Sequence, residues 1–340
     1  MPNSELAKIA KDLVASGKGI LAADESFPTI EKRFTEVGVE STEDSRRRYR
    51  ELLFTTEGIE EFISGIIMFD ETLRLASLSS GKPPAKLLEE KGIISGIKVD
   101  KGAKDMTGFP GEKITEGLDD LRDRLAEYKN LGAKFTKWRA VITIGDRIPT
   151  DTCLDSNSEA LARFAALSQE VGLVPIVEPE VVRDGGHDIK RTEEVTYKTL
   201  KIVFAKLTDH KVKLDGMLLK PNMVTYGKDN QQKASPGEVA EATLRCMREV
   251  VPAEVPGIVF LSGGQTAEEA TANLNEMNKN KDLPWEISFS FSRALQNPVL
   301  KIWSGKEENI ALAQKKFYKR ARLSSLARKG DYKPEMEAEK

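Results

Sequence analysis

The sequence predicts an α/β fold, a single-domain (β/α)8 TIM barrel. Eight short apolar runs recur along the 340 residues, and each ends in polar or charged residues. Helical patterns with recognisable start and stop signals lie between most of them. Because strands that alternate with helices pair in parallel through right-handed crossovers, eight such units imply a closed barrel.

The eight apolar runs are the expected strands of this barrel. In chain order they are Gly19–Asp24, Gly65–Asp70, Ile94–Asp100, Phe135–Ile142, Leu173–Glu180, Leu214–Pro221, Gly257–Gly264 and Trp285–Arg293. The runs share no repeated motif, so their regular recurrence reflects the βα unit rather than a solenoid repeat.

Helix signals follow several of these runs. Ser158–Gly172 places apolar residues at helical spacing and ends on a glycine. Ser235–Val251 opens with Ser-Pro-Gly-Glu, a capping box with proline at the first helical position, and a further helix is expected over Ala267–Met277. No linker divides the chain, so we expect residues 1–330 to form one barrel and the polar residues 331–340 to form a flexible tail.

Composition restricts the class of function. The formal net charge is −2 and the pI is about 6.0, so no overall basic field attracts nucleic acid or an anionic membrane. The basic run Lys315–Arg322 fits the outer face of a last helix better than a nucleic-acid signal. Cys153 and Cys246 are the only cysteines, which suits a reducing compartment. With no signal-peptide pattern and no stretch of about 18 apolar residues, we expect a cytoplasmic protein without membrane or nucleic-acid partners.

The sequence also argues against a metal or a nucleotide cofactor. His187 and His210 are the only histidines, and both lie in polar connections outside any cysteine-rich or histidine-rich cluster. A catalytic zinc site usually needs three protein ligands of this kind. Neither a GxGxxG motif nor a P-loop is present, so we expect no cofactor and no metal.

Charged residues gather at the carboxyl ends of the expected strands, where barrel enzymes carry their active sites. Side chains two residues apart on a strand share one face. The residues concerned are Asp24, Lys98, Asp100, Lys137, Arg139, Glu178, Glu180, Lys220 and Arg293. Strand ends also become polar simply because they meet solvent. Charged groups on so many strands are nevertheless costly to bury unless they are used, which favours an active site.

Lys220 is the expected nucleophile. It ends an apolar strand and precedes a proline, which places an amine at the strand tip. A neutral lysine can attack a ketone and form a Schiff base, and burial together with a neighbouring cation such as Lys137 favours the neutral amine. The alternative is a lysine that binds phosphate or forms a structural ion pair.

Three carboxylates are candidates for proton transfer. Glu178 and Glu180 share one strand face, so repulsion is expected to keep one of them protonated and able to act as an acid and then a base. The alternative is a pair of structural ion-pair partners. Asp24 ends the first strand and could take a hydroxyl proton, although it could also cap the following helix.

Two anion sites are expected at opposite sides of the barrel mouth. The first consists of Ser262, Gly263, Gly264 and Arg293, because glycines let backbone amides approach an anion where a helix begins, although the glycine pair could also form a simple turn. The second would be built from the basic residues Lys98, Arg139 and Arg33. Two such sites suit a substrate with a phosphate at each end.

The motifs together resemble those of class I fructose-1,6-bisphosphate aldolases. The matching blocks, in one order over roughly residues 8–330, are GKGILAADES, GIKVDKG, KWR, VPIVEPE, LLKPNM, FLSGGQ and RALQ. The resemblance implies a metal-independent enzyme, commonly a homotetramer. It also implies reversible cleavage of fructose 1,6-bisphosphate to dihydroxyacetone phosphate and glyceraldehyde 3-phosphate, as in glycolysis and gluconeogenesis.

The resemblance also implies roles for individual residues. Lys220 matches the Schiff-base lysine, Glu178 the acid/base group, and Lys137 and Asp24 further catalytic positions. Positions implied to bind the two phosphates or other parts of the substrate are Ser262, Gly263, Arg293, Lys98, Arg139, Arg33, Arg46 and Ser26.

Three segments depart from the family pattern. Animal members of the family end in a tyrosine, whereas the tail here has no tyrosine after Tyr332. Phe27-Pro28-Thr29 replaces the usual Thr-Gly-Ser, and Phe291-Ser292 replaces the usual Tyr-Gly before Arg293. Two other functions stay open at this point: another Schiff-base sugar-phosphate aldolase, or a non-catalytic scaffold that keeps the barrel. The intact catalytic positions argue against the scaffold.

Overall fold

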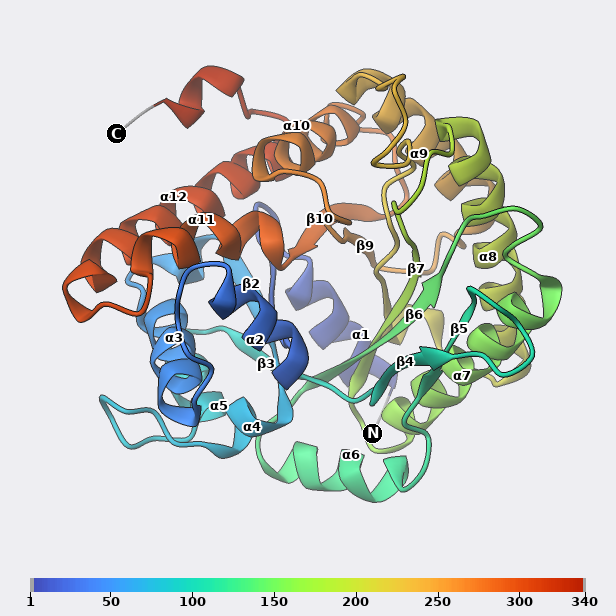
Figure 1. Cartoon of the computed structure of the whole chain (residues 1–340). Coiled ribbons are helices and arrows are strands. Elements are labelled where there is room, and N and C mark those ends of the chain that lie inside the picture. The colour runs from blue at the N-terminus through green and yellow to red at the C-terminus, as the bar shows by residue number, and fades with distance from the viewer. Residues whose placement is uncertain (1–2, 339–340) are drawn as a thin grey trace.

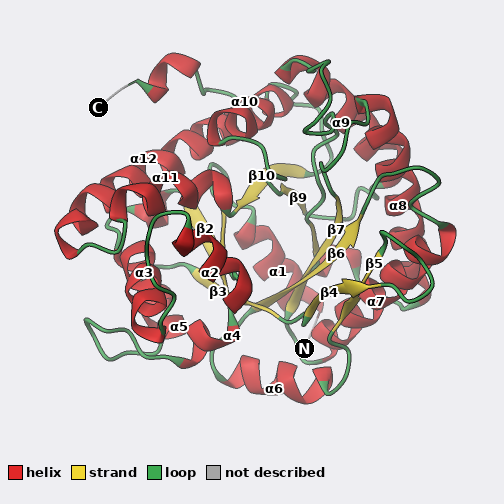
Figure 2. Ribbon diagram, in the orientation of Figure 1, coloured by secondary structure: helices red, strands yellow, loops and turns green. Residues whose placement is uncertain are grey.

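The computed structural model describes residues 3–338, and its centre is a closed barrel of eight parallel strands. Neighbouring strands follow the order β1-β10-β9-β8-β7-β6-β3-β2. Figures 1 and 2 show the barrel surrounded by helices. The strand bounds are β1 Gly19–Ala23, β2 Ile63–Met68, β3 Ile94–Lys98, β6 Phe135–Ile142, β7 Val174–Val181, β8 Leu218–Leu219, β9 Gly257–Phe260 and β10 Glu286–Phe291. The predicted (β/α)8 barrel is confirmed.

Each expected strand overlaps its run, although β2 begins two residues before its run, β7 ends one residue after its run, and β8 is much shorter than predicted. Residues Leu214–Gly216 form a 3-10 turn, which removes the first half of the expected strand. Pro221 has no backbone N–H to extend the ladder beyond Leu219. The backbone N–H of Lys220 still donates to the carbonyl of Val177 at 2.8 Å, so Lys220 stays fixed to the barrel wall.

Twelve helices are present in the described part of the chain. Their bounds are α1 Asn3–Leu13, α2 Phe27–Thr35, α3 Glu43–Thr55, α4 Asp70–Arg74, α5 Pro84–Glu90, α6 Leu121–Asn130, α7 Asp151–Glu170, α8 Ile189–Asp209, α9 Pro236–Val250, α10 Ala267–Asn278, α11 Arg293–Trp303 and α12 Ile310–Lys329. The capping box predicted at Ser235 is present, because its hydroxyl accepts from Glu238 N while the Glu238 carboxylate accepts from Ser235 N. Within residues 3–338, none of the helices combines the length and hydrophobicity that a bilayer crossing requires.

Helix α1 closes the amino-terminal end of the barrel. Its buried residues Leu6 and Leu13 belong to the same apolar cluster as Phe135 of β6. Gly96 of β3 makes room for the Phe135 ring, since a Cβ at Gly96 would lie 2.2 Å from a ring carbon. This end of the barrel is therefore packed with side chains, which leaves the carboxyl end for a binding site.

Two features near the carboxyl end were not predicted. An antiparallel hairpin, β4 (Gly102–Asp105) and β5 (Lys113–Glu116), follows β3. Two helices, α2 and α3, lie between β1 and β2, where the sequence indicated one βα unit. Figure 1 shows α2 and the hairpin near the barrel mouth, where both contribute residues to the site described below.

Part of the predicted tail packs on the barrel. Tyr332 is buried, and its hydroxyl contacts Glu337 Oε1 at 3.1 Å. Glu337 also accepts a hydrogen bond from buried Arg320 of α12 at 2.5 Å. Residues 339–340 lie outside the described residues. The boundary at residue 330 and the flexibility of the tail stay predictions.

Candidate active site

A cleft of about 530 Å³ opens at the carboxyl ends of the strands. Among the described residues that line it are Asp24, Ser26, Arg33, Lys98, Lys137, Arg139, Glu178, Glu180, Lys220, Ser262, Gly263 and Arg293. The structure thus brings together nearly all the residues selected from the sequence. Gly264 and Arg46 are not among the described lining residues.

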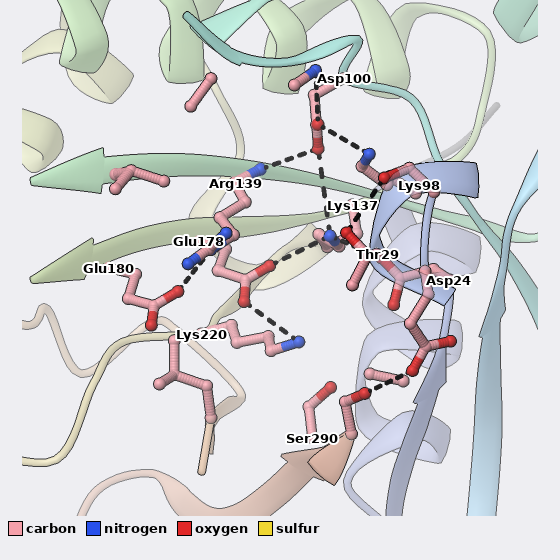
Figure 3. Close-up of a pocket in the computed structure, with 18 of the residues that line it drawn as sticks. Asp24, Thr29, Lys98, Asp100, Lys137, Arg139, Glu178, Glu180, Lys220 and Ser290 are labelled. Atoms are coloured by element: carbon pink, nitrogen blue, oxygen red, sulfur yellow. Dashed lines mark hydrogen bonds and ion pairs between the residues drawn. The ribbon is translucent and has the colours of Figure 1, made fainter. Parts of the chain in front are cut away.

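Lys220 lies at the bottom of the cleft against Glu178. The two residues are 3% and 4% exposed, and Lys220 Nζ is 3.2 Å from Glu178 Oε1. Figure 3 shows the Lys220 side chain reaching Glu178 from the neighbouring strand. A proton can therefore pass directly between the amine and the carboxylate.

Lys137 is surrounded by three carboxylates from three other strand ends. Its Nζ lies 2.7 Å from Asp24 Oδ2, 3.4 Å from Glu178 Oε2 and 3.9 Å from Asp100 Oδ2. Burial alone would lower the pKa of Lys137, but these carboxylates raise it well above its ordinary value. Lys137 is therefore a buried ammonium ion, and Figure 3 shows the contacts of its nitrogen with the surrounding residues.

The same cations keep the nearby carboxylates ionised. Burial by itself raises the pKa of Glu178, but Lys220, Lys137 and Arg139 outweigh burial and hold that pKa below its ordinary value. Burial also opposes ionisation of Asp24, whose pKa is nevertheless lowered by Lys137 and Lys220. The prediction that repulsion keeps a glutamate protonated is therefore wrong for Glu178.

Glu180 has a different partner from Glu178. Its Oε2 accepts a hydrogen bond from Arg139 Nε. The backbone N–H of Arg139 donates to Asp100 Oδ2 at 3.2 Å, and Lys98 Nζ lies 3.2 Å from Asp100 Oδ1. Glu180 and Asp100 therefore hold the two cations, Arg139 and Lys98, on one side of the cleft.

The glycine turn lies on the other side of the cleft. Gly263 and Gly264 have φ values of 53° and 80°, which glycine adopts without the penalty that a Cβ would bring. The Arg293 guanidinium packs against Gly264, since a Cβ there would lie 3.5 Å from Nη2. Burial lowers the pKa of Arg293, and so do the neighbouring cations Arg33 and Arg139. An anion bound here would relieve this repulsion.

Arg46 was predicted to contact substrate, and the structure places it elsewhere. Its guanidinium forms two hydrogen bonds with Glu71, from Nε at 2.8 Å and from Nη2 at 2.5 Å. It also stacks over Phe27, with the guanidinium carbon 4.7 Å from the ring centroid. Arg46 therefore fastens α3 to α4 and to the start of α2, and its assignment to the substrate site is corrected.

Sequence reasoning missed several further residues of the cleft, among them Ser290 and Glu25. Ser290 is 1% exposed, and its hydroxyl has no hydrogen-bond partner among residues 3–338. It lines the cleft, so a ligand hydroxyl could satisfy it. Ser290 lies two residues before Ser292 and three before Arg293, and the strand alternation Ser-Phe-Ser could have indicated it. Glu25 also lines the cleft, next to Asp24 in the sequence.

Glu25 is the centre of a buried ion cluster. Its carboxylate accepts hydrogen bonds from Arg33 and Arg50, and also from Ser292 Oγ at 2.7 Å and Gln296 Nε2 at 2.8 Å. Burial raises the pKa of Glu25, but Arg50 and Arg33 outweigh it and hold the pKa far below its ordinary value. We call these five residues the Glu25 cluster.

The low pKa of Glu25 predicts a pH-dependent contribution to stability. Because the folded pKa is below the unfolded value of about 4.3, the contribution is present above that pH and is lost as pH falls through the folded pKa. We expect Glu25→Gln to lower the free energy of unfolding by about 3–5 kcal/mol at neutral pH. The difference from the wild type should narrow below about pH 4. Urea denaturation across this range measures it, and a pH-independent difference would contradict the assignment.

No group of three or more His, Cys, Asp or Glu side chains suited to a metal ion occurs within residues 3–338. Instead, the carboxylates Asp24, Glu178 and Glu180 each form an ion pair with a lysine or an arginine.

Sequence comparison places the chain among known proteins. The family model of class-I fructose-bisphosphate aldolase matches residues 5–340. A Xanthomonas campestris protein named a probable fructose-bisphosphate aldolase class 1 is 54% identical over 334 residues, covering 98% of this chain and 100% of its own length. An Arabidopsis thaliana protein named fructose-bisphosphate aldolase 5, cytosolic, is 53% identical, covering 96% of this chain and 91% of its own.

Structural comparison agrees with these relatives. Fructose-bisphosphate aldolase from Plasmodium falciparum, solved in a complex with TRAP and a small-molecule inhibitor, superposes with a TM-score of 0.95. It is 48% identical in sequence, and the match covers 97% of this chain and 95% of that one. The family match over nearly the full length and the identities near one half lead to one conclusion: the chain belongs to the class I fructose-bisphosphate aldolase family.

Proposed function

We propose that this protein cleaves fructose 1,6-bisphosphate reversibly into dihydroxyacetone phosphate and glyceraldehyde 3-phosphate, through a Schiff base on Lys220. One observation carries the proposal. The buried Lys220 amine lies 3.2 Å from Glu178, in a cleft with cationic groups on both sides. A covalent amine catalyst and two anchoring sites for anions are what this reaction requires.

Glu178 serves the first step in both of its protonation states. As a carboxylate it takes a proton from Lys220, and the freed amine attacks the C2 ketone to form a carbinolamine. The protonated Glu178 then donates to the carbinolamine hydroxyl, which leaves as water and gives the iminium ion. Lys137, 3.4 Å from Glu178, stabilises the negative charge as it develops on the carboxylate.

Asp24 serves the second step. Its low pKa keeps it ionised, so it can accept the proton of the C4 hydroxyl while the C3–C4 bond breaks. The electron pair of that bond moves into the iminium, which becomes an enamine, and the C4 carbon leaves as an aldehyde. Ser290, with its unpartnered hydroxyl, is suited to hold a substrate hydroxyl beside Asp24.

The two ends of the cleft suit the two phosphates. Ser262, Gly263 and Arg293 form one cradle, and Lys98 and Arg139 form the other. Binding both ends holds the sugar extended over Lys220, which lowers the entropic part of the barrier. Ser26, at the start of α2, lines the same cleft and supports the substrate.

We also propose a homotetrameric, cytoplasmic enzyme. The family resemblance supports the tetramer, and the Arabidopsis relative whose name includes the word cytosolic supports the location. Size-exclusion chromatography with light scattering measures the subunit number.

Borohydride trapping tests the proposed function. Reduction in the presence of dihydroxyacetone phosphate is expected to leave a stable adduct on the peptide that contains Lys220. In parallel, cleavage of fructose 1,6-bisphosphate is expected to continue at full rate in the presence of a chelator. An adduct on a different lysine would overturn the site, and activity lost in chelator would overturn the metal-free mechanism. A product assay that finds a different aldehyde would identify another sugar-phosphate aldolase.

A further inference from the structure

Arg33 lies at the end of the cleft that carries Arg293, not with Lys98 and Arg139 as the sequence suggested. Its Nη1 donates to Ser292 Oγ at 3.1 Å and to Glu25 Oε1. Ser292 directly precedes Arg293, and Arg33 is one of the cations that lower the pKa of Arg293. Arg33 of α2 and Arg293 of α11 both line the cleft, and Arg33 is hydrogen-bonded to the residue that precedes Arg293.

Ser292 does not use its hydroxyl to cap a helix, although it occupies the N-cap position of α11. An N-cap serine usually accepts a hydrogen bond from a backbone N–H of the first turn. Ser292 makes no such bond. Instead its hydroxyl donates to Glu25 at 2.7 Å and accepts from Arg33 and Gln296, each at 3.1 Å. The side chain thus joins α11 to the residue that fixes Arg33.

Glu25 is itself held rigidly from its other side. Arg50 binds the second carboxylate oxygen, and its Nη1 donates to Gln296 Oε1 at 3.2 Å. Gln296 Nε2 donates to the carbonyl of Ala22 in β1 at 2.7 Å. The Glu25 cluster is thereby anchored to the barrel wall, so a side chain that binds Glu25 is fixed relative to the strand ends.

The cluster leaves Arg33 free to bind an anion. Both of its hydrogen bonds within residues 3–338 come from Nη1, so Nε and Nη2 remain available as donors, and Arg33 lines the cleft. Two arginines, Arg33 and Arg50, share the one carboxylate of Glu25, so the cluster keeps a net positive charge. A guanidinium held in place loses less entropy when it binds phosphate than one that must be ordered.

We propose that Ser292 and Glu25 are positioning residues that hold Arg33 beside Arg293, so that two arginines bind the phosphate at the glycine-turn end of the substrate. This inference rests on the proposed function for the identity of the substrate. It assigns a role to Ser292, which stands where the family pattern has glycine. The resulting clamp consists of one arginine from α2 and one from α11, linked through the serine hydroxyl.

Ser292→Ala tests the clamp by removing the hydroxyl that joins Arg33 to Glu25 while keeping the backbone at this position. We expect KM for fructose 1,6-bisphosphate to rise about fivefold to tenfold, the effect of weakening one charge-assisted contact, while kcat stays nearly unchanged. Ser292→Thr keeps the hydroxyl and should restore KM. The matched control is Ser288→Ala in β10, the strand that precedes Ser292, because the buried Ser288 hydroxyl donates to the Lys18 carbonyl and Ser288 is not among the described lining residues of the cleft.

A double variant separates positioning from a structural role. If Ser292 acts through Arg33, then Arg33→Ala and the double variant Arg33→Ala/Ser292→Ala should have the same KM. Once the Arg33 guanidinium is absent, removing the Ser292 hydroxyl can no longer change its position. Additive effects would overturn the proposal. A loss of stability in Ser292→Ala with KM unchanged would also overturn it.

Inorganic phosphate makes the test independent of catalysis. The rise in Tm that phosphate produces reports its affinity for the folded protein, and it should be smaller in Ser292→Ala than in Ser288→Ala. If the wild type neither cleaved fructose 1,6-bisphosphate nor formed an adduct, the proposed function would be wrong. The phosphate measurement would still test the clamp, because it does not depend on catalysis. Equal rises in the two variants would refute the clamp.

Discussion

Lys220→Met is expected to reduce kcat for cleavage by about five to six orders of magnitude, the effect of removing a covalent nucleophile. Methionine has a similar length and is apolar, so it fills the site of the 3%-exposed lysine without forming an imine. Glu178 keeps Lys137 as a partner at 3.4 Å, so we expect the variant to fold. Single-turnover kinetics with fructose 1,6-bisphosphate measures the loss.

The control for this variant removes a lysine that has no part in the cleft. Lys228 is exposed and forms a surface ion pair with Asp184 at 2.6 Å. Lys228→Met should retain wild-type kcat, because exposed ion pairs contribute little. If Lys220→Met kept a rate within tenfold of the wild type, the amine would not be the nucleophile, and the Schiff-base mechanism would be wrong.

The carboxyl-end cleft was predictable because strand geometry is local. Alternation along β6 and β7 is enough to place Lys137 with Arg139, and Glu178 with Glu180, on inward-facing positions. The parallel pairing of the two strands, with Arg139 opposite Glu178, then brings these charges together. Any closed barrel with these strands would assemble the same set of residues.

Partners and charge states were harder to predict because they depend on contacts between distant segments. Ser292 and Glu25 are 267 residues apart, and no pattern in either segment indicates that they touch. The sequence made Arg46 a candidate for substrate binding, but in the structure its guanidinium is hydrogen-bonded to Glu71. Likewise, Glu178 was a candidate for a protonated glutamate, but cations from other strands surround it and hold its pKa below its ordinary value.

Lys137→Met should lower both kcat and the free energy of unfolding, because this one buried ammonium group neutralises charge on three neighbouring carboxylates. Without it, Asp24 and Glu178 lose the charge that lowers their pKa, so a larger fraction of each would be protonated and unable to accept a proton. We expect kcat to fall by about a thousandfold. The free energy of unfolding should fall by about 3–5 kcal/mol at neutral pH, since buried charges lose their partner.

The pH dependence distinguishes this electrostatic role from simple loss of packing. Carboxylates that lack Lys137 have a raised folded pKa, so the variant is least stable relative to the wild type at neutral pH and recovers as pH falls and they bind protons. Lys134→Met, at an exposed position just before β6, is the matched control and should show neither effect. Urea denaturation at neutral and mildly acidic pH measures the difference. A gap that stays constant with pH would mean that Lys137 acts by filling space, and the assignment of Glu178 and Asp24 as ionised proton acceptors would lose its basis.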